Sequence, residues 1–141
     1  MPHWDWEFRH FPRLGTRVLA TRLASQGVGL IAGHHAHVVQ PVERIGRTIV
    51  AYGLGDFLGT ALPRQPWPGR IGGIFIVDVS ADAGTRGAVA SYRLHPFVRL
   101  RAGDHERLLP VAGLKGRMRG KVKGRLEAIF PSPRSEEGVT A

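Results

Sequence analysis

The chain alternates between short apolar runs and breaks rich in glycine or proline. Within residues 13–25, apolar side chains recur at near-helical spacing, at Leu14, Val18, Leu19 and Leu23. Gly27 follows this stretch, and glycine commonly ends helices. The pattern predicts one amphipathic helix over residues 13–25 that buries the apolar stripe.

After this helix the pattern changes to runs typical of strands. The predicted strands cover residues 28–32, 42–45, 48–51, 71–79 and 88–94. Gly46-Arg47 separates the second and third runs, as in a tight hairpin turn, and residues 82–87 form a turn between the last two. The proline-rich residues 62–69 predict a surface loop. The expected fold class is α/β in the form of an α+β sandwich, with strands dominating after residue 28.

The C-terminal part of the chain is strongly basic. The whole chain has 20 Lys and Arg against 11 Asp and Glu, a formal net charge of +9, which favours anionic partners. Six of these cations lie within eleven residues that contain no acid: Lys115, Arg117, Arg119, Lys121, Lys123 and Arg125. Glycines interrupt the stretch, and each weakens a helix by about 1 kcal/mol relative to alanine. We therefore expect a domain over residues 1–110 and a flexible basic tail over residues 111–141.

That basic stretch lacks the features of a specific nucleic-acid or membrane binder. No aromatic side chain is interleaved with the charges to stack on a base, and no apolar stripe accompanies them. No run in the chain approaches the roughly 20 apolar residues that span a bilayer, and the N-terminus does not read as a signal peptide. The expectation is a chain that is soluble as given, without a transmembrane segment and without specific nucleic-acid binding.

Candidate chemistry concentrates in the histidines that follow the first predicted strand. His34, His35 and His37 come directly after residues 28–32. If the strand continues, His35 and His37 face one side and His34 faces the other. The chain has no cysteine, so any metal must bind nitrogen and oxygen ligands, and imidazole suits zinc, iron, manganese and nickel. A polar loop whose histidines only bond carbonyl groups is the alternative, and the metal interpretation is favoured over it.

Three segments in order resemble the CapA family, the poly-gamma-glutamate capsule-synthesis type of calcineurin-like metallophosphatase. They are residues 3–7 (His-Trp-Asp-Trp-Glu), residues 33–41 (Gly-His-His-Ala-His-Val-Val-Gln-Pro) and residues 52–57 (Tyr-Gly-Leu-Gly-Asp-Phe). Family members carry His-Trp-Gly-x-Glu, His-Pro-His-Val before Gln-Pro, and Tyr-Ser-Leu-Gly-Asn-Phe. The resemblance covers roughly residues 2–95. It implies the C-terminal half of a four-layer metallophosphoesterase fold, in a truncated chain or in one that a second chain completes.

The resemblance also implies a set of site residues. His3 corresponds to a lone metal-ligand histidine, and His35 and His37 correspond to paired ligand histidines. Glu7 is expected to orient His3 by a hydrogen bond, ahead of binding metal itself or capping the local surface. The implied cofactors are divalent Mn, Fe or Zn, as one ion or as a pair about 3.5 to 4 Å apart that activates water against a phosphate ester. His34 or His37 is the implied general acid.

The sequence departs from the family pattern at four positions. Asp5, Ala36, Gly53 and Asp56 stand where the family has glycine, proline, serine and asparagine. Asp56 matters most, because its carboxylate can bind a metal as a hard oxygen ligand or cap backbone N–H groups. Capping is favoured, since Gly55 beside it signals an unusual backbone conformation. Asp56 is therefore expected outside the set of direct ligands.

Two hypotheses about function follow. In the first, the chain holds the histidine half of a metal-dependent phosphoesterase of capsule biosynthesis, which hydrolyses an anionic phosphate ester once the N-terminal half is supplied. In the second, it is a non-catalytic part of a capsule-synthesis complex that binds an anionic polymer such as polyglutamate through its arginines. Family members are often membrane-associated or extracytoplasmic, whereas the sequence itself does not specify a compartment.

Overall fold

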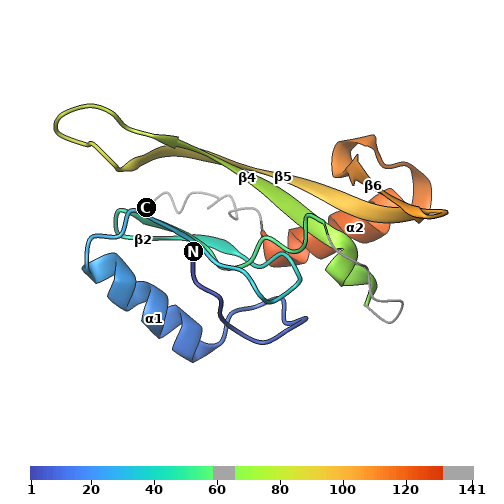
Figure 1. Cartoon of the computed structure of the whole chain (residues 1–141), viewed down its shortest axis with the longest axis horizontal. Helices are drawn as coiled ribbons and strands as arrows, with labels where there is room; N and C mark the ends of the chain where they lie inside the picture. The colour runs from blue at the N-terminus through green and yellow to red at the C-terminus, as the bar shows by residue number, and fades with distance from the viewer. Residues whose placement is uncertain (59–65, 132–141) are drawn as a thin grey trace, which may run out of the picture.

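Two three-stranded sheets, each covered by one helix, make up the described part of the chain. A computed structural model describes residues 1–58 and 66–131 (Figure 1). The first sheet has the order β1-β3-β2, with β1 (Leu30–Ala32) parallel to β3 (Thr48–Ala51) and β2 (Val42–Ile45) antiparallel to β3. The second is antiparallel, with the order β4 (Ile71–Val79), β5 (Val89–Ala102), β6 (His105–Pro110). The expected mixture of helices and strands is confirmed.

The predicted N-terminal helix is present, but the face that it buries differs in part from the expected one. α1 (Leu14–Ser25) is followed by Gly27, whose φ of +85° suits glycine. Ala20 is fully buried in a cluster with Ile31, Val50, Tyr52 and Trp4. Of the expected apolar stripe, Leu23 packs against this cluster, whereas Leu14 and Val18 are 79% and 43% exposed, so the stripe is buried only in part. Alanine on the inner face lets the helix backbone approach the sheet more closely than leucine would.

The predicted hairpin is confirmed residue by residue. β2 and β3 occupy the two predicted runs, and Gly46 in the turn between them has a φ of +58°. All four residues of β3 are buried, as expected for a central strand covered on both faces. The predicted first strand is shorter, because β1 begins at Leu30.

The C-terminal sheet extends beyond its prediction. β4 is confirmed as predicted, whereas β5 continues eight residues past the expected end at Leu94 and pairs with β6, which the sequence pattern did not predict. Pro96 lies within β5, but pairing with β6 begins at Phe97. The missing N–H of Pro96 therefore interrupts no bond to β6.

The basic stretch is largely helical. α2 (Gly116–Ile129) follows η2 (Val111–Gly113), so the prediction of a flexible tail is wrong for residues 116–129, and residues 132–141 lie outside the described part. Leu114, Val122 and Ile129 are buried, and Leu126 packs against the same core cluster as Leu114 and Val122. These residues form an apolar stripe that the sequence analysis overlooked. Burial of this stripe against the second sheet outweighs the low helix propensity of the glycines.

Contacts with the segment before β4 also help to fix the position of α2. Trp67 begins η1 (Trp67–Arg70), within the predicted proline-rich loop, of which residues 62–65 lie outside the described part. The Lys121 ammonium lies 4.2 Å and the Arg125 guanidinium 5.7 Å from the Trp67 ring centre. Such cation–π contacts add to the burial of the apolar stripe.

The chain crosses from the first sheet to the second near the histidines. Beyond β3, the Leu54 carbonyl accepts a hydrogen bond from the Gly73 N–H at 2.8 Å, so the start of β4 lies against residues 54–56. A Cβ at Gly72 would contact the Asp56 carbonyl at 2.8 Å, which shows how closely the two segments pass. This crossing brings the second sheet into contact with the candidate site. Within the described ranges, neither α1 nor α2 has the length and apolar character needed to cross a membrane.

Candidate metal centre

The first eight residues lie alongside the histidine segment and bring two candidate ligands to it. The His34 N–H donates to the Pro2 carbonyl at 3.1 Å, and the Trp4 N–H donates to the His34 carbonyl at 3.2 Å. The Phe8 N–H donates to the Ala36 carbonyl at 2.7 Å. This pairing places His3 and Glu7, which are far from the histidines in sequence, next to them in space.

A loop rather than a strand presents the histidines. β1 ends at Ala32, and residues 35–38 bend. The prediction that strand alternation brings His35 and His37 together is therefore wrong, because a bent loop does so instead. Within residues 1–58 and 66–131, four non-glycine residues have positive φ: Asp5 at 72°, Phe8 at 59°, His35 at 97° and His37 at 55°. Left-handed non-glycine residues are uncommon and cluster at functional sites. All four lie in the histidine loop or in the N-terminal segment that pairs with it.

Glu7, His35 and His37 form a group with the geometry of a metal site. One ligand atom from each lies within 4.8 Å of the others. The His37 Nε2 atom is 4.0 Å from the Glu7 Oε1 atom, and the two imidazole rings are 6.1 Å apart between centres. Two imidazoles and a carboxylate are a donor set that zinc, iron and manganese accept, and three protein ligands leave a position for water. The residues present therefore fit the divalent ion that the sequence predicted.

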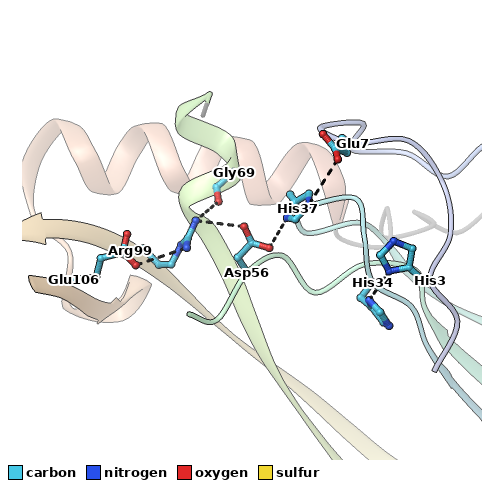
Figure 2. Close-up of polar contacts among 8 residues, drawn as sticks. All are labelled: His3, Glu7, His34, His37, Asp56, Gly69, Arg99 and Glu106. Atoms are coloured by element: carbon cyan, nitrogen blue, oxygen red, sulfur yellow. Dashed lines mark hydrogen bonds and ion pairs between the residues drawn. The ribbon is translucent and has the colours of Figure 1, made fainter. Parts of the chain in front are cut away.

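Asp56 holds His37 in a defined orientation. The His37 Nδ1 atom is 2.7 Å from the Asp56 Oδ1 atom, so Nδ1–H donates to the carboxylate, and the Nε2 atom faces Glu7 (Figure 2). A carboxylate that fixes a ligand histidine in this way is the usual outer partner of a metal site. In the structure the Asp56 side chain thus contacts His37, whereas the sequence favoured a role in capping backbone N–H groups.

His3 and His34 form a second pair beside this group. Their Nδ1 atoms are 3.2 Å apart, and the His3 ring centre lies 4.1 Å from that of His35. Desolvation lowers the pKa of His3, and the charges that His35, His34 and His37 carry when protonated lower this pKa further. His3 therefore favours its neutral form, which is the form that can bind metal. The group of three ligand atoms does not include His3, whereas Glu7, expected only to orient a ligand, belongs to that group.

Asp5, which replaces the family glycine, organises the N-terminal segment. Its buried carboxylate accepts the Trp6 N–H at 2.9 Å and the Arg13 N–H at 3.1 Å. The Arg13 side chain pairs with the same carboxylate at 3.2 Å, and Gln40 donates to it at 3.4 Å. Aspartate tolerates the left-handed conformation better than most residues. Asp5 therefore keeps the turn that holds Glu7 in place and also stabilises the start of α1.

The stability of the protein is expected to fall as the pH drops below about 6.5. His10 is half-buried with its Nδ1 atom 3.4 Å from the Val39 carbonyl. Burial lowers the pKa of His10; the bond to Val39 opposes this shift, and Arg125 adds to it. Because the folded pKa is below the unfolded value, the unfolded chain binds more protons, and the stability that is complete above the unfolded pKa declines as the pH falls. Thermal melts between pH 8 and pH 5 test this.

A matched pair of variants isolates the contribution of His10. His10→Asn keeps a donor for the Val39 carbonyl but does not titrate, so its melting temperature should depend less on pH than that of the wild type. His105→Asn, at an exposed position on β6, should melt with the wild-type pH dependence. Equal slopes in wild type and His10→Asn would contradict the prediction.

Comparison with known proteins finds a family match over the part of the chain that holds the candidate metal centre. Residues 1–61 match the family described as "Bacterial capsule synthesis protein PGA_cap". The match covers less than half of the chain, so residues 1–61 are similar to that family. The three motifs that carry the resemblance to CapA proteins all lie within the matched residues, so the resemblance is confirmed there. For residues 62–95 the resemblance stays a prediction.

Two CapA proteins from Bacillus are similar over the same region. The "PGA biosynthesis protein CapA" of Bacillus subtilis (strain 168) is 38% identical over 56 residues, which are 40% of this chain and 15% of that protein. The "Capsule biosynthesis protein CapA" of Bacillus anthracis is 34% identical over 56 residues, 40% of this chain and 14% of that protein. The similarity thus spans a small part of these CapA proteins. No solved structure matches the chain.

Proposed function

We propose that this chain contributes to bacterial capsule biosynthesis as part of a metal-dependent phosphoesterase of the CapA type. The observation that carries the proposal is the convergence of Glu7, His35 and His37, with His37 held by Asp56. The names of the two Bacillus relatives support the role in capsule biosynthesis. The proposed substrate is an anionic phosphate ester, in keeping with the net charge of +9.

Each residue has a defined task in this proposal. Glu7, His35 and His37 would hold a divalent Mn, Fe or Zn ion, which, when bound, lowers the pKa of a coordinated water and polarises the phosphoryl group. Asp56 accepts a hydrogen bond from the Nδ1–H group of His37 and so keeps the Nε2 atom available to bind the ion. His34 is exposed, its Nδ1 atom lies 3.2 Å from the His3 Nδ1 atom, and it would serve as the proton donor next to the ligand group.

The site is open to large substrates. Glu7 is 53% exposed and His37 is 40% exposed at the side chain, so the ligand atoms lie at the surface. A hollow of about 630 Å³ lies elsewhere, lined by the end of α1 and by the turns that contain Arg47 and Arg86, and none of the candidate ligands lines it. The proposed substrate therefore approaches the metal ligands from solvent rather than by entering a deep pocket.

Hydrolysis of simple phosphate esters tests the proposal. The purified chain, loaded with Mn²⁺, should hydrolyse p-nitrophenyl phosphate or its bis ester, and EDTA should abolish the activity. Glu7→Gln should lower the rate at least about tenfold through weaker metal binding, whereas Glu127→Gln, at an exposed position on α2, should leave the rate unchanged. Metal bound at stoichiometric level without any hydrolysis would contradict autonomous activity. Recovery of activity with an added N-terminal half of a CapA domain would then support a complementing chain.

Binding of an anionic polymer is a second candidate function, favoured by α2. Arg117, Arg119, Lys121 and Lys123 are exposed on this helix, and Arg125 is partly buried. Polyglutamate binding that survives EDTA and is lost as salt is raised would favour this function, because screening weakens exposed charge contacts. Loss of polymer binding with EDTA would instead favour the metal centre as the binding site.

A further inference from the structure

Arg99 is a buried cation from the second sheet that contacts the candidate metal centre. It lies on β5, outside the residues that match the capsule synthesis family, and its side chain is 2% exposed. One guanidinium nitrogen, Nη2, is 3.4 Å from the Asp56 Oδ2 atom and 3.2 Å from the Gly69 carbonyl oxygen. The other, Nη1, is 3.7 Å from the Glu106 Oε2 atom. A buried guanidinium requires such partners, and their arrangement fixes its position.

The Asp56 carboxylate connects this cation to His37. Its Oδ2 atom faces Arg99, and its Oδ1 atom lies 2.7 Å from the His37 Nδ1 atom. Figure 2 shows the side chains of Arg99, Asp56, His37 and Glu7 one after another in space, each joined to the next by a dashed contact. The two oxygens of one carboxylate therefore face opposite partners, so rotation of the carboxylate would break both contacts. The side chain exposure of Asp56 is 23%, which leaves limited freedom for water to replace either contact.

We propose that Arg99 is a positioning residue of the metal centre. Its guanidinium holds the Asp56 carboxylate so that Oδ1 accepts a hydrogen bond from the His37 Nδ1–H group. His37 then presents Nε2 toward Glu7. This inference rests on the proposed function, because it assigns Arg99 a role in the same site. It also makes β5 part of the functional unit, although the family match ends at residue 61.

The electrostatic part of the proposal concerns the charge on Asp56. A carboxylate that is close to a metal-bound imidazole would also attract the ion or other donors if no cation balanced it. The Arg99 guanidinium supplies that balance from the side away from His37. A charge-assisted contact between guanidinium and carboxylate is stronger and more directional than a contact with a neutral partner.

A double-mutant cycle separates positioning from a general structural role. Mn²⁺ affinity is measured by isothermal titration calorimetry for the wild type, Arg99→Met, Asp56→Asn and the double variant. With Asp56 in place, Arg99→Met should weaken Mn²⁺ binding about tenfold, the size usual for outer partners of metal ligands. In the Asp56→Asn background, the same change should weaken it less than about twofold, because the charge that Arg99 holds is already absent. Equal losses in both backgrounds would overturn the inference.

Control variants test whether the effect belongs to this arginine. Arg93→Met removes an exposed guanidinium from the same strand and should leave the Mn²⁺ affinity unchanged. If Arg99→Met does not fold, Arg99→Lys retains the charge but lacks the planar fork, and it should bind Mn²⁺ more weakly than the wild type. Wild-type affinity in Arg99→Lys would then overturn the inference.

A measurement on metal-free protein keeps this inference distinct from the proposed function. The ¹⁵N signals of the His37 ring at pH 8 report which nitrogen carries the proton. The wild type should show the proton on Nδ1, and Arg99→Met should show a mixture of both tautomers. An unchanged tautomer in Arg99→Met would overturn the role of Arg99 even if metal binds. Absence of Mn²⁺ binding in the wild type, with a changed tautomer in the variant, would overturn the proposed function alone.

Discussion

Replacing both His35 and His37 with alanine is expected to remove bound divalent metal from the protein. The two imidazoles are two of the three groups whose ligand atoms lie within 4.8 Å of one another, and Glu7 alone cannot retain an ion against dilution. Elemental analysis after dialysis without chelator should find near-stoichiometric manganese, iron or zinc in the wild type and background levels in the double variant.

The matched control for this experiment is the double variant His95→Ala/His105→Ala. It removes the same two side chains from exposed positions on β5 and β6 and should keep the wild-type metal content. Thermal melts confirm that both double variants fold. Metal that persists in His35→Ala/His37→Ala, or a folded wild type without metal, would contradict the metal centre.

Gly33→Ala is expected to destabilise the protein severely. Gly33 lies between the end of β1 and the histidines, beneath the Trp4 indole, whose Nε1–H donates to the Tyr52 carbonyl at 2.8 Å. A Cβ at this position would overlap the Trp4 indole and the Tyr52 carbonyl oxygen. One partner is backbone in the buried core and the other is a buried ring, so neither can move without breaking their mutual hydrogen bond. The cost should reach about 3 kcal/mol, at the upper end for overpacking.

Gly15→Ala provides the contrast, since it makes the same chemical change in α1 where no atom lies within 4 Å of the new Cβ. That variant should be neutral or more stable by up to about 1 kcal/mol, because alanine favours the helix. Urea unfolding curves give the free energy of unfolding of both variants. Similar stabilities for the two would show that Trp4 can leave its position above Gly33 at little cost.

The sequence was most informative where local chemistry determines the structure. The hairpin of β2 and β3 followed from β-branched runs around Gly46, and both strands have the predicted bounds. The histidine cluster was visible for a similar reason, because three imidazoles occupy neighbouring positions. The pairing of His35 with His37 was correct as an expectation of proximity, although a bent loop rather than a strand brings them together.

Tertiary contacts decided the features that the sequence did not reveal. The glycines of α2 argued against a helix, yet burial of Val122 with Ile71 and Val98 of the second sheet supports one. The proximity of Glu7 to His37 depends on pairing between the first eight residues and the histidine loop, which no periodic pattern encodes. Arg99 was one of many arginines in the sequence, and its contact with Asp56 appears only when β5 lies beside residues 54–56.

The left-handed backbone at His35 and His37 has a consequence for how substitutions in this loop should be judged. Glycine adopts positive φ without steric strain, whereas other L-residues pay on the order of 1 kcal/mol for it. If folding were the sole requirement, glycine would be the more stable choice at both positions. A substitution to glycine there would relieve this strain and, under the proposed function, would also remove a metal ligand. A higher melting temperature of such a variant would therefore not show that metal binding is kept.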